Sequence, residues 1–70
     1  MKIANAQDLG TLIKNARQSQ GMTQTELAGA CGTGVRFIVD LEKGKPTCEL
    51  EKSLRVLSML GIRLDASQPK

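Results

Sequence analysis

Residues 22–47, MTQTELAGACGTGVRFIVDLEKGKPT, contain two short helical patterns separated by a Cys-Gly-Thr-Gly run. Glycine is about 1 kcal/mol less favourable than alanine inside a helix, and this run places two glycines within four residues. One continuous helix is therefore not expected across residues 31–34. The chain must instead turn sharply between two helices, and this corner restricts the fold more than any other feature of the sequence.

The helix before the corner has recognisable ends. Thr23 and Glu26 have the spacing of a capping box, in which each side chain bonds the backbone N–H of the other residue. Gly32 is suited to end this helix in a left-handed turn. The helix after the corner is expected to begin at Thr33 or Gly34. Its expected apolar positions are Val35, Ile38 and Leu41, and Gly44 ends it.

Helices are also expected on both sides of this pair. Residues 5–21, NAQDLGTLIKNARQSQG, place apolar side chains on one helical face, with Asn5 as the N-cap. Gly10 inside this pattern lowers helix stability by about 1 kcal/mol relative to alanine, which is consistent with close packing. Thr47 is the expected cap of a last helix. The inward residues expected in that helix are Leu50, Leu54 and Leu57, widened by Val56, Met59 and Leu60.

The pattern changes after the last helix. Ile62 and Leu64 alternate with Arg63 and Asp65, the period of two that indicates a strand. A single strand leaves backbone groups unpaired, and nothing else in the chain reads as a strand. These four residues are therefore expected to form a dimer interface with the same strand of a second copy. The predicted segments are a helical domain at 1–61, a dimerising strand at 62–66 and a flexible tail at 67–70.

Composition excludes several classes of function. The 70 residues suffice for one domain, and the net charge of +3 fits nucleic-acid binding as well as an ordinary mixed-charge surface. One Phe without Trp or Tyr cannot supply the several stacking aromatics of single-stranded nucleic-acid proteins. The chain has no His and no nucleophile or carboxylate motif with an activating group. We therefore expect no enzyme and no cofactor.

Cys31 and Cys48 are the only cysteines, and without histidine they make no usual zinc site. They are expected to be reduced, partly buried side chains, so no metal is predicted. No stretch approaches the ~18 apolar residues of a membrane span, and MKIANAQDLG does not look like a secretory leader. The chain is expected to be cytoplasmic.

Two short helices joined by a three- or four-residue turn containing glycine form a helix-turn-helix. When such a motif binds DNA, the first helix lies across the backbone and the second enters the major groove. The sequence TQTELAGACGTGVRFIVDLEKGK resembles the motif of the Xre/Cro family of phage and bacterial repressors. The resemblance covers about residues 8–60, with the motif at 23–44, and implies an all-α, lambda-repressor-like DNA-binding domain of four to five helices. The matching residues are Thr23, Gln24, Glu26, Leu27, Ala28, Gly32, Ile38, Leu41, Glu42, Gly44 and Lys45.

The segment RFIVDLEKGKPT, followed by a helix and then LGIRLDA, is similar to the HipB-type antitoxins, which are small Xre-family repressors. In that group a C-terminal strand pairs across a dimer. The resemblance implies a nucleoid-associated homodimer that binds a palindromic operator and represses its own operon. It also implies a partner toxin of the HipA kinase class, so the chain is expected to be the antitoxin of a toxin–antitoxin system.

The resemblance places Gly34, Val35, Arg36 and Val39 toward the groove, and Asp40 is expected near it. Arg36 is the best candidate for base reading, because its guanidinium can donate two hydrogen bonds to guanine O6 and N7. Val35 is suited to a thymine methyl group, and Asp40 to cytosine N4. Each also has an alternative as an ordinary surface or marginal core residue. The expected base-contacting residues are Gly34, Val35, Arg36, Val39 and Asp40.

Phosphate contacts are expected around the same helix. The Gln24 amide lies at a helix N-terminus, where free N–H groups and the helix dipole favour a phosphate. The resemblance also implies an ion pair between Arg17 and Glu42 that leaves guanidinium donors for DNA. The two turn lysines contact the backbone or are simply solvated. The expected phosphate-contacting residues are Arg17, Thr23, Gln24, Lys43 and Lys45.

Two other functions fit these residues. A solitary Xre-family regulator would carry the same motif without a toxin, and only gene neighbourhood or co-purification separates the two. A protein-interaction antitoxin that does not bind DNA belongs to a different class. Such a module has no need to gather hydrogen-bond donors around one helix, as this chain does with Arg17, Gln24, Arg36 and Lys43.

Overall fold

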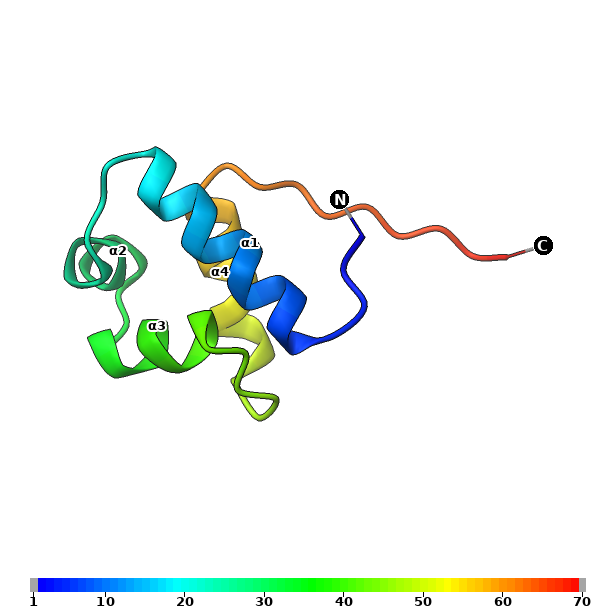
Figure 1. Cartoon of the computed structure of the whole chain (residues 1–70), viewed down its shortest axis with the longest axis horizontal. Coiled ribbons are helices and arrows are strands. Elements are labelled where there is room, and N and C mark those ends of the chain that lie inside the picture. Colours follow the sequence, from blue (N-terminus) through cyan, green and yellow to red (C-terminus); the bar gives the residue numbers. More distant parts are fainter. Residues whose placement is uncertain (1, 70) are drawn as a thin grey trace.

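A computed structural model describes residues 2–69, which form four helices joined by short turns (Figure 1). Helix α3 packs against α1 and α2, and α2 also packs against α4. The all-α fold expected from the sequence is confirmed. Met1, the first residue of the predicted domain 1–61, and Lys70, the last residue of the predicted tail 67–70, lie outside the described residues. The helices are α1 (Ala6–Ser19), α2 (Gln24–Cys31), α3 (Val35–Glu42) and α4 (Leu50–Met59).

The first two helices begin at the caps that the sequence predicts. The Asn5 side chain accepts a hydrogen bond from the Asp8 backbone N–H at 2.8 Å. The Thr23 hydroxyl accepts from the Glu26 N–H at 3.0 Å, and the Thr23 N–H donates to the Glu26 carboxylate at 2.9 Å. This capping box is complete, and the Thr23 N–H is the main reason that the pKa of Glu26 lies below its usual value.

The corner between α2 and α3 depends on one glycine. Gly32 has a φ of 69°, a left-handed conformation that carries little cost only for glycine. The Thr33 N–H then donates to the Ala28 carbonyl at 2.9 Å, which closes the end of α2. Gly34 precedes α3 with an ordinary φ of −76°. The corner is therefore present as predicted, and Gly32 alone makes the turn.

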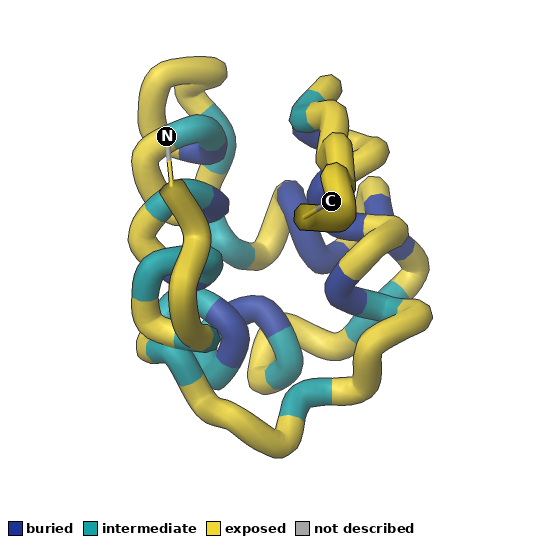
Figure 2. The backbone as a smooth tube through the Cα atoms, turned by 90° about the vertical axis from the view of Figure 1, so that its right-hand side faces the viewer, coloured by how far each residue is buried: buried dark blue, intermediate teal, exposed yellow. Residues whose placement is uncertain are grey.

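A single small core lies between the helices. Figure 2 shows their buried segments facing one another, while the C-terminal segment is exposed. Within residues 2–69, no helix is long and apolar enough to cross a membrane. The buried apolar residues among those described are Ile13, Leu27, Ala28, Cys31, Ile38, Leu41, Val56, Leu57 and Leu60.

The sequence-based prediction for α4 was wrong in two respects. Helix α4 begins after Glu49, so Thr47 does not cap it. Leu50 and Leu54 are 70% and 41% exposed and do not face the core. The inward stripe begins with Ser53, which is buried, and its hydroxyl is satisfied because it donates to the Glu49 carbonyl at 2.8 Å. The prediction counted only apolar side chains as inward, so it missed the face of α4 that includes Ser53. The stripe continues through Val56, Leu57 and Leu60, while Met59 is 48% exposed.

The C-terminal segment forms neither helix nor strand over residues 62–69. It leaves the end of α4 and runs away from the helices (Figure 1). Ile62 packs against the core, whereas Leu64 is 52% exposed. The structure describes one chain, so the strand predicted at residues 62–66, which needs a second copy, stays a prediction.

Candidate nucleic-acid interface

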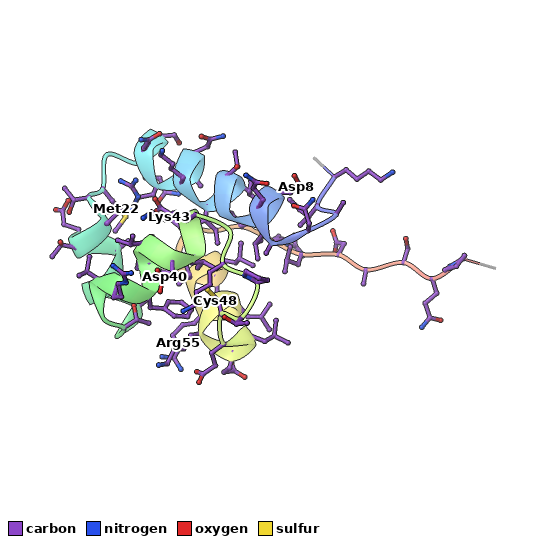
Figure 3. All side chains as sticks on the ribbon, turned by 60° about the horizontal axis from the view of Figure 1, so that its bottom comes forward. Asp8, Met22, Asp40, Lys43, Cys48 and Arg55 are labelled. Carbon is purple, nitrogen blue, oxygen red and sulfur yellow. The ribbon has the colours of Figure 1, made fainter. Side chains whose placement is uncertain are left out.

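Helix α3 has an anchored face and a free face. Ile38 and Leu41 are buried in the core, and the opposite side chains recur at the helical spacing i, i+3, i+4, i+7. We call these four residues the outer face of α3. Figure 3 brings this helix forward and labels two of them, Asp40 and Lys43. The outer face consists of Arg36, Val39 and Asp40 of α3 together with Lys43, the residue that follows its last turn. Arg36 and Lys43 are exposed, and Val39 and Asp40 are half-buried.

The N-terminal end of α3 is also free. Gly34 is exposed, and an added Cβ atom there would meet no atom within 4 Å. Val35 is 44% exposed, and the Arg36 side chain is 82% exposed. None of these side chains is needed by the core. The N-terminal end of α3 therefore presents one apolar and one cationic side chain to solvent.

A buried ion pair fastens α1 to the end of α3. Arg17 Nε donates to one carboxylate oxygen of Glu42 at 2.6 Å, and Nη2 donates to the other at 3.0 Å. Nη1 donates to the Met22 carbonyl at 2.8 Å. The two charged side chains are only 10% and 3% exposed. The side-chain hydrogen bonds to Glu42 raise the pKa of Arg17 above its ordinary value, so the guanidinium keeps its charge. Every guanidinium nitrogen thus has a protein partner, and only the remaining N–H groups are left for a phosphate.

Gln24 joins this pair, which the sequence did not predict. Its side-chain nitrogen donates to Glu42 at 3.1 Å, on the same carboxylate oxygen that Arg17 Nη2 uses. The second amide hydrogen of Gln24 has no partner among the described residues. The expected phosphate ligand is therefore held by the buried pair, beside Thr23 at the N-terminus of α2. No spacing rule reveals this contact, because the two residues lie 18 positions apart.

The turn after α3 places its two lysines differently. Lys43 is exposed, and its ammonium group makes no ion pair within residues 2–69. The Lys45 ammonium lies 3.5 Å from Oδ2 of Asp40, and Arg36 Nε lies 3.4 Å from Oδ1 of the same residue. The i, i+4 spacing of Arg36 and Asp40 could have indicated their ion pair. The ion pair between Lys45 and Asp40 depends on the tight turn after α3, and no sequence pattern indicates it.

The cysteines take no part in this surface. Both thiols are free, with Cys31 buried and Cys48 half-buried. Burial raises the pKa of each thiol above its ordinary value, so both stay protonated at neutral pH. Across residues 2–69 no group of three or more His, Cys, Asp or Glu residues is placed to hold a metal ion.

The sharp corner, the anchored first motif helix and the free face of the second define a helix-turn-helix domain. The helix-turn-helix family model matches residues 13–66. The protein y4mF of Sinorhizobium fredii, described as an HTH-type transcriptional regulator, is 47% identical over 68 residues, which are 97% of this chain and 90% of that protein. The chain belongs to the Xre-type helix-turn-helix family, which is a family of regulators and not of enzymes.

Solved structures of HipB have the same fold. One, described as a HipB–O4 20mer complex, is 27% identical with a TM-score of 0.87, covering 100% of this chain and 99% of that chain. Another, described as a HipA–HipB–O2–O3 complex, is 27% identical with a TM-score of 0.88 and the same coverage. The likeness to HipB therefore extends over the whole domain and is not confined to the motif.

Proposed function

We propose that this chain is a sequence-specific, double-stranded DNA-binding transcriptional repressor. The observation that carries the proposal is the free end of α3. Arg36 and Val35 are exposed there although Ile38 and Leu41 hold the same helix in the core. A guanidinium and a branched methyl side chain suit guanine and the thymine methyl group respectively. Membership of a family whose relative is described as a transcriptional regulator supports the proposal.

Phosphate contacts complete the proposed binding mode. The free amide hydrogen of Gln24 and the N-terminal N–H groups of α2 form one donor group, with Thr23 beside it. Lys43 supplies a second donor, next to Glu42 at the C-terminal end of α3. Together they would hold the DNA backbone beside that end of α3, and so fix the register in which Arg36 meets the base pairs. Lys45 and the remaining donors of Arg17 are weaker contributors because both side chains already have partners.

The DNA-binding unit is proposed to be a homodimer. Two grooves, of about 280 and 440 Å³, flank the C-terminal segment. A strand pair between two copies at residues 62–66 would satisfy the backbone groups of both and bring apolar side chains such as Leu64 into these grooves. Two copies would then present their α3 helices about 34 Å apart, to two half-sites of a palindromic operator. The residues that line both grooves are Ile62, Arg63 and Leu64.

A second part of the proposal is that this chain has a toxin as its partner. The likeness to HipB in a complex with HipA extends over 100% of this chain. We infer that the chain is the antitoxin of a HipA-like kinase and represses the operon that encodes both. Co-expression with the neighbouring gene, followed by pull-down, tests this part separately. Binding of an operator without capture of a kinase would leave a solitary regulator.

DNA binding itself is tested by selection from a randomised duplex library and by footprinting of the promoter upstream of the gene. We expect one palindromic site with two half-sites a helical turn apart. Failure to protect any DNA at low salt would remove the proposed function. Capture of a kinase without DNA protection would instead favour the protein-interaction antitoxin that does not bind DNA.

Replacement of Lys43 with alanine is expected to weaken operator and non-operator binding by the same factor. Each phosphate contact contributes about 0.9 to the slope of log K against log salt, so the slope should become shallower by about one per subunit of the dimer. Titrations between 50 and 200 mM salt (about the range over which such slopes are clear) measure this change. Lys14→Ala, on the exposed side of α1, is the matched control and should keep the wild-type slope.

Replacement of Leu64 with aspartate is expected to convert the dimer into a monomer. The new charge would have to be buried between two copies without a partner. Sedimentation velocity should show the mass halved, and operator affinity should fall with it because one half-site contact is lost. Gln68→Asp makes the same change of charge beyond the proposed strand and should remain dimeric. A Leu64→Asp dimer of unchanged affinity would contradict this interface.

A further inference from the structure

Asp40 lies between two cations that come from different parts of the chain. Its Oδ1 is 3.4 Å from Arg36 Nε, and its Oδ2 is 3.5 Å from the Lys45 ammonium. The Asp40 side chain is 20% exposed, whereas those of Arg36 and Lys45 are 82% and 53% exposed. One shielded carboxylate therefore holds two side chains that point into solvent on the surface proposed to meet DNA.

The charges of α3 run against the helix dipole. A helix is stabilised by acidic residues in its first turn and basic residues in its last, and α3 has neither. Arg36 instead lies at the start and Asp40 near the end, the less favourable order for an i, i+4 pair. Exposed ion pairs contribute little to stability in any case. The stability of α3 therefore does not explain why this carboxylate is there.

The geometry of the pair leaves the useful part of Arg36 free. Asp40 faces Nε, so both terminal amino groups remain available, and these can donate together to guanine O6 and N7. A side chain already held in one position loses less conformational freedom when it binds. We propose that Asp40 is a positioning residue that sets base specificity by holding Arg36 toward guanine and keeping Lys45 away from phosphates. The inference rests on the proposed function and assigns a role within the same surface.

The same carboxylate is expected to oppose binding to DNA of any sequence. Asp40 neutralises Lys45 and places a negative charge near the phosphates. Non-specific affinity comes almost entirely from phosphate contacts, so this arrangement lowers it while Arg36 keeps its contact with the correct base. Asp40 thereby widens the difference between operator and random DNA. This role differs from direct recognition of cytosine N4, in which one carboxylate oxygen of Asp40 would accept a hydrogen bond from the base.

The test uses the full chain, the duplex that the wild type selects from a randomised library, and a scrambled duplex of equal length. Asp40→Asn should bind the scrambled duplex several-fold more tightly and steepen the salt slope by about one per subunit of the dimer, because Lys45 is released to a phosphate. The ratio of operator to scrambled affinity should fall about tenfold, the scale of one bidentate guanine contact. Glu51→Gln, an exposed position on α4 with the same change of charge, is the control and should keep the wild-type ratio.

The pairing with Arg36 is tested by a double-mutant cycle. Arg36→Lys alone should lower the same ratio, and adding it to Asp40→Asn should lower the ratio no further. An unchanged ratio in Asp40→Asn would overturn the inference while leaving DNA binding intact. The inference would also be overturned if Asp40→Asn changed the base preference at a single cytosine, or if it bound the operator and the scrambled duplex more tightly by the same factor. A wild type that selects no sequence at all would overturn the proposed function and this inference together.

Discussion

Replacement of Glu42 with alanine is expected to destabilise the fold by about 3–5 kcal/mol, because it leaves a buried guanidinium without its partner. Glu42 accepts hydrogen bonds from Arg17 at 2.6 and 3.0 Å and from Gln24 at 3.1 Å. The stability of most domains is only about 5–15 kcal/mol, so this is a large fraction of the total. Thermal unfolding followed by circular dichroism should show a melting temperature lower by at least about 12 °C.

DNA binding should be lost together with stability in Glu42→Ala, because the same carboxylate holds Gln24 at the proposed phosphate site. The exposed Glu51→Ala is the control, and we expect its stability to change by less than about 0.5 kcal/mol. The double variant Arg17→Met/Glu42→Leu separates the two effects. Exchange of both charges for apolar side chains should recover much of the stability without restoring the position of Gln24. An unchanged melting temperature in Glu42→Ala would contradict the structural role of the pair.

Local rules of the sequence predicted the frame of this domain well. The caps at Asn5 and Thr23 and the turn at Gly32 each depend on residues within a few positions of one another, and all three form as expected. The same short-range reasoning gave the corner between α2 and α3. Features of this kind depend on local backbone hydrogen bonds and φ angles, and residue types at short spacings indicate them.

Features that depend on distant packing were predicted less well. The inward face of α4 was misplaced because Ser53 occupies a core position that only its bond to the Glu49 carbonyl makes tolerable. The contact of Gln24 with Glu42 and that of Lys45 with Asp40 have no pattern in the sequence. Of the candidate site, the sequence therefore indicated which residues face outward on α3. It did not indicate which of them are already held by a partner.

Replacement of Gly10 with alanine is expected to destabilise the domain by about 2 kcal/mol, although helix propensity alone predicts a gain of about 1 kcal/mol. An added Cβ atom would lie 2.5 Å from the Leu41 carbonyl oxygen and 2.7 Å from that of Glu42. These are backbone atoms and cannot rotate away, so α1 and α3 must move apart. Overpacking of this kind costs about 1–3 kcal/mol or more. Urea unfolding at constant temperature measures the difference.

Gly29→Ala is the matched control, because it is the same substitution inside a helix with no atom within 4 Å of the new Cβ. It should stabilise the fold by about 0.5–1 kcal/mol, so the two variants differ in sign. Gly10→Ala should also weaken operator binding. Gly10, Ile13 and Arg17 are the buried residues of α1, and the close approach at Gly10 lets Arg17 reach Glu42 from the same face. A stabilised Gly10→Ala would mean that α1 and α3 do not meet this closely.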